Sequence, residues 1–250
     1  MTCVREWVIL QRYRRRQSFG EELANSVSHG LGLLGAIAVT PVLVGRAIER
    51  DDVAAVVGNS VFCVAMAFLY LSSSLYHALP LGRAKRVVRR CDHAAIYMLI
   101  AGTYTPFTLG VLRGPWGWTL FGMVWTLAIL GLFVESRVHL RIMEGATSEP
   151  GGFSERFKPP GSQSRARQAT RRLSIAIYLA MGWLALIAVG PIWHAVSTAG
   201  LFWIVAGGLS YMVGLTFYAA SGVRYAHLAW HLCVLVGSAC FFLAVLWYSY

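Results

Sequence analysis

The chain has 250 residues, of which 57% are hydrophobic and only 13% are charged. A soluble domain of this length would carry roughly twice that share of charged residues, so the composition excludes an ordinary soluble globular protein. The net charge of +11 would suit a nucleic-acid-binding protein, but membrane topology explains the basic residues better, and no nucleic-acid partner is expected.

Apolar blocks of about 20 residues, long enough to cross a bilayer as helices, recur along the chain. Backbone groups in lipid have no water to bond, so such blocks must be helical. We therefore expect an all-α membrane protein, a seven-transmembrane helix bundle that forms one domain over residues 27–250. The predicted spans are 27–48, 54–79, 94–112, 116–135, 173–191, 196–219 and 226–248.

Two segments outside these spans are expected to lie in the cytoplasm. Residues 1–26 form a charged arm with the run RYRRR, which does not have the form of a cleavable signal peptide. Residues 137–172 are basic and rich in Gly, Pro and Ser. We expect this connection to be a long flexible loop, because it has little apolar surface to bury.

The basic residues are distributed unevenly between the two sides of the predicted bundle. Nineteen of the 22 Lys and Arg residues fall in the N-terminal arm and in the second, fourth and sixth connections. The other side has only Arg46, Arg50 and Arg113. The positive-inside rule then predicts a cytoplasmic N-terminus and an external C-terminus.

Ionisable side chains near or inside the spans are costly in lipid and are therefore informative. His77 ends the second span, Asp92 precedes the third, and His227 and His231 begin the seventh. Each lies within seven residues of a flanking arginine, which is about 10 Å along a helix. The topology therefore places these four side chains in the same layer of the membrane, near the cytoplasmic leaflet.

The spacing of these residues favours a metal site. His227 and His231 are four residues apart, so they share one helix face and can bind one ion together. With His77 they would supply three imidazole nitrogens, which suits Zn²⁺ with a fourth position left for water. Asp92 would then take a proton from that water, and Ser73, one turn from His77, would help to position it or a substrate carbonyl.

Each of these residues also has a structural interpretation. A histidine on an apolar helix is often a packing residue, Asp92 could cap its helix, and Ser73 could bond to a helix carbonyl. Glu22, Asn25 and His29 precede or begin the first span. They could be helix-start residues, or they could form a face that closes over the site and orients its ligands.

Four motifs resemble those of the hemolysin III family, the bacterial branch of the progestin and adiponectin receptor family. They are ELANSVSH (22–29), SSLYH (73–77), DHAAIY (92–97) and HLAWH (227–231). The resemblance implies a seven-helix bundle with an inside N-terminus. It also implies that zinc is held by His77, His227 and His231, with Asp92 contacting zinc through water and Ser73 nearby.

Alkaline ceramidases are distantly similar to this family, and they suggest a reaction. We expect a zinc-dependent membrane hydrolase of a lipid amide or ester, with a sphingolipid- or fatty-acyl-type substrate. The family name keeps a pore-forming or membrane-stress protein open as an alternative, as well as a receptor-like protein with structural zinc. In each case the expected location is the bacterial cytoplasmic membrane.

Overall fold

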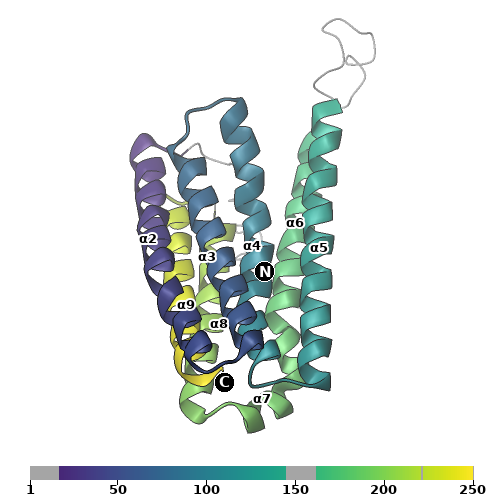
Figure 1. Cartoon of the computed structure of the whole chain (residues 1–250). Coiled ribbons are helices and arrows are strands. Elements are labelled where there is room, and N and C mark those ends of the chain that lie inside the picture. Colours follow the sequence, from purple (N-terminus) through teal and green to yellow (C-terminus); the bar gives the residue numbers. More distant parts are fainter. Residues whose placement is uncertain (1–16, 145–161, 221, 250) are drawn as a thin grey trace, which may run out of the picture.

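A computed structural model describes residues 17–144, 162–220 and 222–249 of the chain, and for 137–144 and 162–171 it describes the backbone only. Every regular element in these ranges is a helix (Figure 1). The helices are α2 (Phe19–Glu49), α3 (Val53–Ala78), α4 (Arg83–Leu109), α5 (Pro115–Glu144), α6 (Ser162–Trp183), α7 (Val189–Ala195), α8 (Thr198–Ala219) and α9 (Ala226–Tyr248), with a 3₁₀ segment at Leu184–Ala188.

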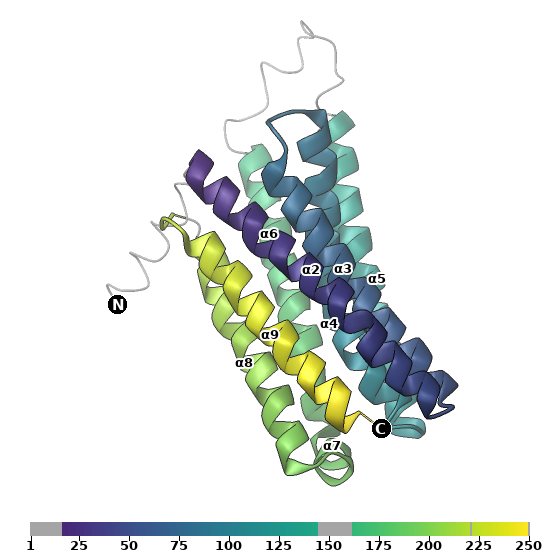
Figure 2. The same ribbon diagram turned by 60° about the vertical axis from the view of Figure 1, so that its left-hand side comes forward.

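The long helices form one bundle in which successive helices run in opposite directions (Figures 1 and 2). Helix α2 packs on α3 and on α9, α3 packs on α4, α4 on α5, and α8 on α9. The starts of α2, α4 and α9 therefore share one end of the bundle with the ends of α3 and α8. We call this the proximal end and the opposite end, where α2 stops and α3 begins, the distal end.

The outer surface of the bundle is apolar. On α2, for example, Leu31, Leu34 and Ile37 are more than half exposed, as expected for side chains that face lipid. Six helical segments of the described chain are long and apolar enough to cross a membrane, and α4 is not among them. Polar residues lower the mean hydropathy of α4, and among them Thr103, Thr105 and Thr108 are buried inside the protein.

A glycine brings α2 close to two neighbouring helices. A Cβ atom on Gly32 would lie 2.6 Å from Leu235 Cδ2 of α9 and 2.9 Å from the Tyr70 ring of α3. Only a residue without a side chain allows this approach. Helix α2 is therefore seated directly against the two helices that carry the predicted histidine ligands.

The helices begin and end at positions that differ from the prediction. Helix α2 starts at Phe19, because Ser18 and Glu21 form a capping box in which each side chain accepts a hydrogen bond from the backbone N–H of the other residue. Residues 19–26 of the expected arm are therefore helical, and residues 1–16 lie outside the described residues. Similarly, α5 continues to Glu144 and α6 begins at Ser162, so both ends of the expected loop 137–172 are helical, and residues 145–161 lie outside the described chain.

The predicted fifth span, 173–191, is not one continuous α-helix. Helix α6 gives way to the 3₁₀ segment Leu184–Ala188, and α7 follows. Pro191 explains the interruption: it has no N–H for the carbonyl of Ile187, and its ring crowds that carbonyl. The whole stretch Arg172–Ala195 still has the length and hydropathy of a membrane span.

Candidate metal centre

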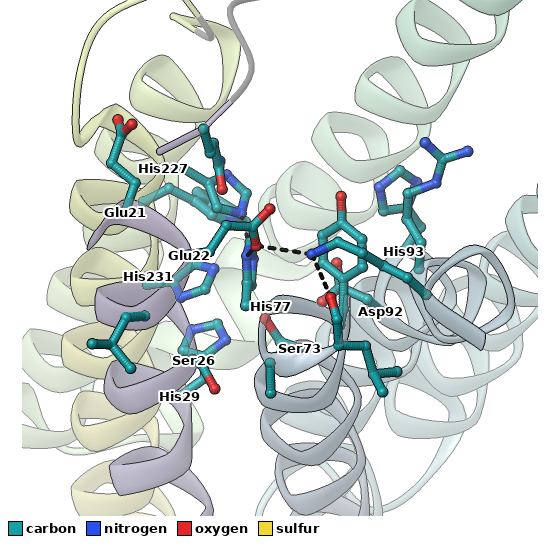
Figure 3. A pocket seen from close by; sticks show the side chains of 18 of the residues that line it. Glu21, Glu22, Ser26, His29, Ser73, His77, Asp92, His93, His227 and His231 are labelled. Carbon is teal, nitrogen blue, oxygen red and sulfur yellow. Dashed lines mark hydrogen bonds and ion pairs between the residues drawn. The ribbon is translucent and has the colours of Figure 1, made fainter. Parts of the chain in front are cut away.

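Three histidine side chains converge at the proximal end of the bundle (Figure 3). They are His77 from the last turn of α3, and His227 and His231 from the first two turns of α9. One nitrogen of each ring lies within 4.8 Å of the others, and the Nε2 atoms of His77 and His227 are 3.1 Å apart. Two nitrogens bound tetrahedrally to zinc at ~2.0–2.1 Å lie about 3.3 Å apart, so the His77 and His227 nitrogens already have the spacing of two ligands of one ion.

The start of α9, which sets the position of His227 and His231, is fixed by α2. Tyr225 precedes α9 with a left-handed backbone, φ 57°, which is unusual for a bulky residue. Its N–H donates to Glu21 Oε1 at 2.9 Å. The Glu21 carboxylate that closes the capping box of α2 thus also holds Tyr225, the residue directly before α9.

Hydrogen bonds that they donate to α2 orient two of the three histidines. His77 Nδ1 lies 2.8 Å from Glu22 Oε2, and His231 Nδ1 lies 3.2 Å from the Asn25 carbonyl and 3.0 Å from Ser28 Oγ. A carboxylate and a carbonyl only accept, so each Nδ1 is the protonated nitrogen. Each Nε2 then keeps its lone pair for a metal ion, which is the usual arrangement around metal-binding histidines.

His29 supports the same cluster by stacking. Its ring lies parallel to the His231 ring, with centroids 3.6 Å apart, and meets the Tyr70 ring edge-on. Neither ring nitrogen of His29 has a hydrogen-bond partner among the described residues. The structure therefore brings Glu22, Asn25 and His29 to the histidine trio, with Glu22 and Asn25 in hydrogen-bond contact with it.

A cavity of about 930 Å³ lies beside the trio. Asp92 of α4 and Ser73 of α3 line it. The lining also includes the apolar residues Leu69, Ile96, Phe217, Trp230 and Val234. The cavity thus combines polar groups with apolar surface that suits hydrocarbon.

His93, which follows Asp92, belongs to a different set of contacts. Its Nδ1 lies 3.2 Å from Glu135 Oε1 of α5, and its carbonyl accepts a hydrogen bond from the Tyr178 hydroxyl. These contacts tie α4 to α5 and α6. They make His93 a residue that joins helices, outside the histidine trio.

Sequence reasoning missed Lys85. It was counted with the basic residues of a cytoplasmic connection, but its side chain is only 10% exposed and its Nζ lies 3.1 Å from Glu22 Oε2. Spacing could have revealed it, because Lys85 and Asp92 are seven residues apart and so lie two turns apart on one helix face. A second signal is that Lys85 and Lys158 are the only lysines of the sequence.

The arrangement can bind a divalent transition metal. Three imidazole nitrogens suit Zn²⁺, but also Cu, Fe and Ni, so the donor set alone gives a metal site without naming the metal. The carboxylate and hydroxyl of Asp92 and Ser73 share the cavity with the trio, and they are the groups needed for proton transfer and for hydrogen bonding to a carbonyl.

The chain matches the family model described as "Haemolysin-III related" over residues 17–242. It is 35% identical to "Hemolysin-3" of Bacillus cereus over 235 residues, which covers 94% of each chain. It is 38% identical to "Hemolysin-3 homolog" of Bacillus subtilis (strain 168) over 228 residues, 91% of this chain and 94% of the relative. A more distant relative is "Monocyte to macrophage differentiation factor" of Homo sapiens, 23% identical over 239 residues, 92% of this chain and 85% of the other.

Proposed function

The chain belongs to the haemolysin-III related family, and from that premise we propose that it is a zinc-dependent hydrolase of a lipid amide or ester. It is a multi-pass integral protein of the bacterial membrane. The observation that carries the proposal is the convergence of three imidazoles with a carboxylate and a hydroxyl around one cavity. A purely structural metal site would need neither the cavity nor Asp92.

In this proposal His77, His227 and His231 hold the zinc ion. Bound zinc supplies a Lewis acid that polarises a carbonyl and brings the pKa of water toward ~7. Glu22 and the Asn25 carbonyl keep the Nδ1 protons of His77 and His231 in place, so that both rings present Nε2.

Asp92 and Ser73 act on the reacting groups. Asp92 accepts the proton of the attacking water at its carboxylate and returns it to the leaving amine or alcohol. Ser73 donates a hydrogen bond from its hydroxyl to the oxygen that becomes negative in the transition state. Both side chains line the cavity, which supports direct contact with a bound substrate.

The cavity supports a lipid as substrate. Its volume of about 930 Å³ lies near the upper end of the range for small-molecule sites. Its apolar lining from Ile96, Phe217 and Trp230 suits an acyl chain or a sphingoid chain. The carbonyl at the end of that chain would then lie next to the histidine trio.

We further propose that α4 completes a set of seven spans, with the N-terminus, residues 1–26 and the connection 137–172 on the cytoplasmic side. The three basic residues expected on the external side support this orientation, since Arg46, Arg50 and Arg113 lie at the distal end of the bundle. A reporter that is active only outside the cytoplasm, fused after Tyr250, tests it. Activity is expected from that fusion, and an inactive fusion would reverse the topology.

The decisive experiment is elemental analysis of the purified wild type and of His227→Ala, followed by hydrolysis assays on the same samples with N-acyl and O-acyl lipids. We expect about one zinc per wild-type chain, a loss of zinc in the variant, and lipid cleavage by the wild type alone. Zinc without cleavage of any lipid would favour the structural-metal alternative. Ion conductance in pure liposomes that persists in a His77→Ala variant would favour a pore.

A further inference from the structure

The Lys85 ammonium group is held by three acceptors. Its Nζ lies 3.1 Å from Glu22 Oε2 and 3.1 Å from the Leu79 carbonyl, and 4.9 Å from the centroid of the Tyr76 ring. An ammonium group has three N–H donors, and the chain offers a carboxylate, a carbonyl and an aromatic face. A lysine that served only membrane topology would extend into water and would need none of these contacts.

The His77 ring and the Lys85 ammonium group contact the same oxygen of Glu22. His77 Nδ1 lies 2.8 Å from Oε2, and Lys85 Nζ lies 3.1 Å from the same atom (Figure 3). The carboxylate therefore cannot turn toward His77 independently of Lys85. Tyr76 adds a second link, because its ring contacts Lys85 and also packs against the His77 ring in a T-shaped arrangement.

We propose that Lys85 is a positioning residue of the metal centre, which fixes Glu22 and through it the orientation of the His77 ring. The contact joins three helices, since Lys85 lies on α4, Glu22 on α2 and His77 on α3. Lys85 and Asp92 share one face of α4, two turns apart. The lysine thus also sets the position of Asp92 relative to the histidine trio.

The choice of lysine is consistent with this role. The neighbouring basic positions Arg83, Arg86, Arg89 and Arg90 are all arginine, and the whole sequence has only two lysines. Arginine presents a planar fork of donors, whereas an ammonium is compact and directs its donors to three sides. The carboxylate, carbonyl and ring around Lys85 suit the second geometry.

The inference rests on the proposed metal binding, so the test measures zinc itself. Zinc affinity is determined by chelator competition for the wild type, Lys85→Met, Glu22→Gln and the double variant, in detergent-purified full-length protein. Arg86→Met, an exposed neighbour, is the matched control. The absorption spectrum of the Co²⁺-loaded proteins reports the ligand geometry independently of turnover.

Lys85→Met is expected to weaken zinc binding about 10-fold or more and to alter the Co²⁺ spectrum, as for other residues that orient metal ligands. In the Glu22→Gln background it should have no further effect, because Lys85 acts through Glu22. If Lys85→Met does not yield folded protein, Lys85→Gln, which keeps donors but loses the charge, is measured with the same expectation.

Two results would overturn the inference while leaving the proposed function intact. One is wild-type zinc affinity in the Lys85 variant. The other is an equal loss of zinc affinity when Lys85→Met is introduced into the wild type and into Glu22→Gln. That result would mean that the lysine does not act through Glu22. A wild-type protein that binds no zinc would overturn both proposals, and it is recognised by the empty wild-type sample.

Discussion

The two ends of the bundle use ion pairs in different ways. At the proximal end the Lys85–Glu22 pair is mostly buried, with side chains 10% and 27% exposed, and it contacts a histidine of the candidate metal centre. At the distal end Arg113 and Asp52 form a shorter contact, 2.7 Å, but the arginine is 55% exposed. Distance alone does not rank the two pairs.

Burial and neighbouring groups account for the difference. The distal pair links two connections at the bundle surface, where water screens the charges and an ion pair contributes about 0–1 kcal/mol. The proximal pair lies among His77, Tyr76 and the Leu79 carbonyl, where an unpaired charge would be costly. Substitutions at the proximal end should therefore affect chemistry, and those at the distal end should affect stability slightly.

The largest effect is expected from His231→Ala at the proximal end. It removes a nitrogen ligand and leaves His77 and His227 alone, so zinc content and lipid turnover should both be lost. His194→Ala, an exposed histidine of α7, is the distal control and should retain both. Elemental analysis of the two purified variants checks this. Retention of zinc by His231→Ala would remove His231 from the metal site.

Asp92→Asn should separate metal binding from chemistry. The amide cannot accept a proton, so turnover should fall by roughly 10²- to 10⁴-fold while zinc is retained. Asp52→Asn makes the same chemical change at the distal end and should leave turnover unaltered. Rates of lipid hydrolysis and zinc content of both variants are measured together. Full activity in Asp92→Asn would reject its role as the base.

A smaller effect is expected from Ser73→Ala. Loss of one donor to the developing oxyanion should lower the turnover number by roughly 10²-fold with zinc retained. Ser72→Ala is the matched control, because Ser72 is equally buried and donates to the Leu69 carbonyl of its own helix. Equal rates for the two variants would indicate that Ser73 only supports the helix.

The smallest effect should come from Arg113→Ala at the distal end. It should lower the free energy of unfolding by less than about 1 kcal/mol at neutral pH and leave zinc content unchanged. The Ala55 backbone N–H and the Arg113 guanidinium hold the pKa of Asp52 below its ordinary value. Stability from such a carboxyl is present above its unfolded pKa, about 3.9, and is lost as the pH falls through the folded pKa.

The difference in the free energy of unfolding between wild type and Arg113→Ala should therefore narrow as the pH is lowered from about 5. Thermal unfolding in detergent at a series of pH values measures it. A gap that stays constant below pH 3 would show that the arginine acts through packing instead of through Asp52.

Helical class, family and membrane location could be predicted from the sequence because each depends on patterns longer than a few residues. Long apolar blocks must be helices in lipid, whichever residues they contain. The positions where helices begin and end depend on local groups, such as the Ser18–Glu21 capping box and Pro191, and the predicted boundaries missed both. The predicted span 94–112 falls largely within α4, which is not among the six described segments that are apolar enough to cross a membrane.

The candidate site could be located because spacing and depth act together. The i, i+4 spacing of His227 and His231 places them on one face, and the flanking arginines place His77 at the same level. The contacts of Glu22 with His77 and of Asn25 with His231 depend on how α2 is rotated, so sequence spacing left their role open. Lys85 was missed because a basic residue in a connection already has a sufficient explanation in the positive-inside rule.

The 3₁₀ segment Leu184–Ala188 changes the phase of the helix that contains it. Each 3₁₀ residue turns by about 120° and rises about 2.0 Å, against about 100° and 1.5 Å in an α-helix. Over five residues the chain gains about 2.5 Å of length and about 100° of rotation. Side chains of α7 therefore point about a quarter turn away from the direction that the periodicity of α6 would give them, and a helical wheel drawn through the whole stretch assigns them to the wrong face.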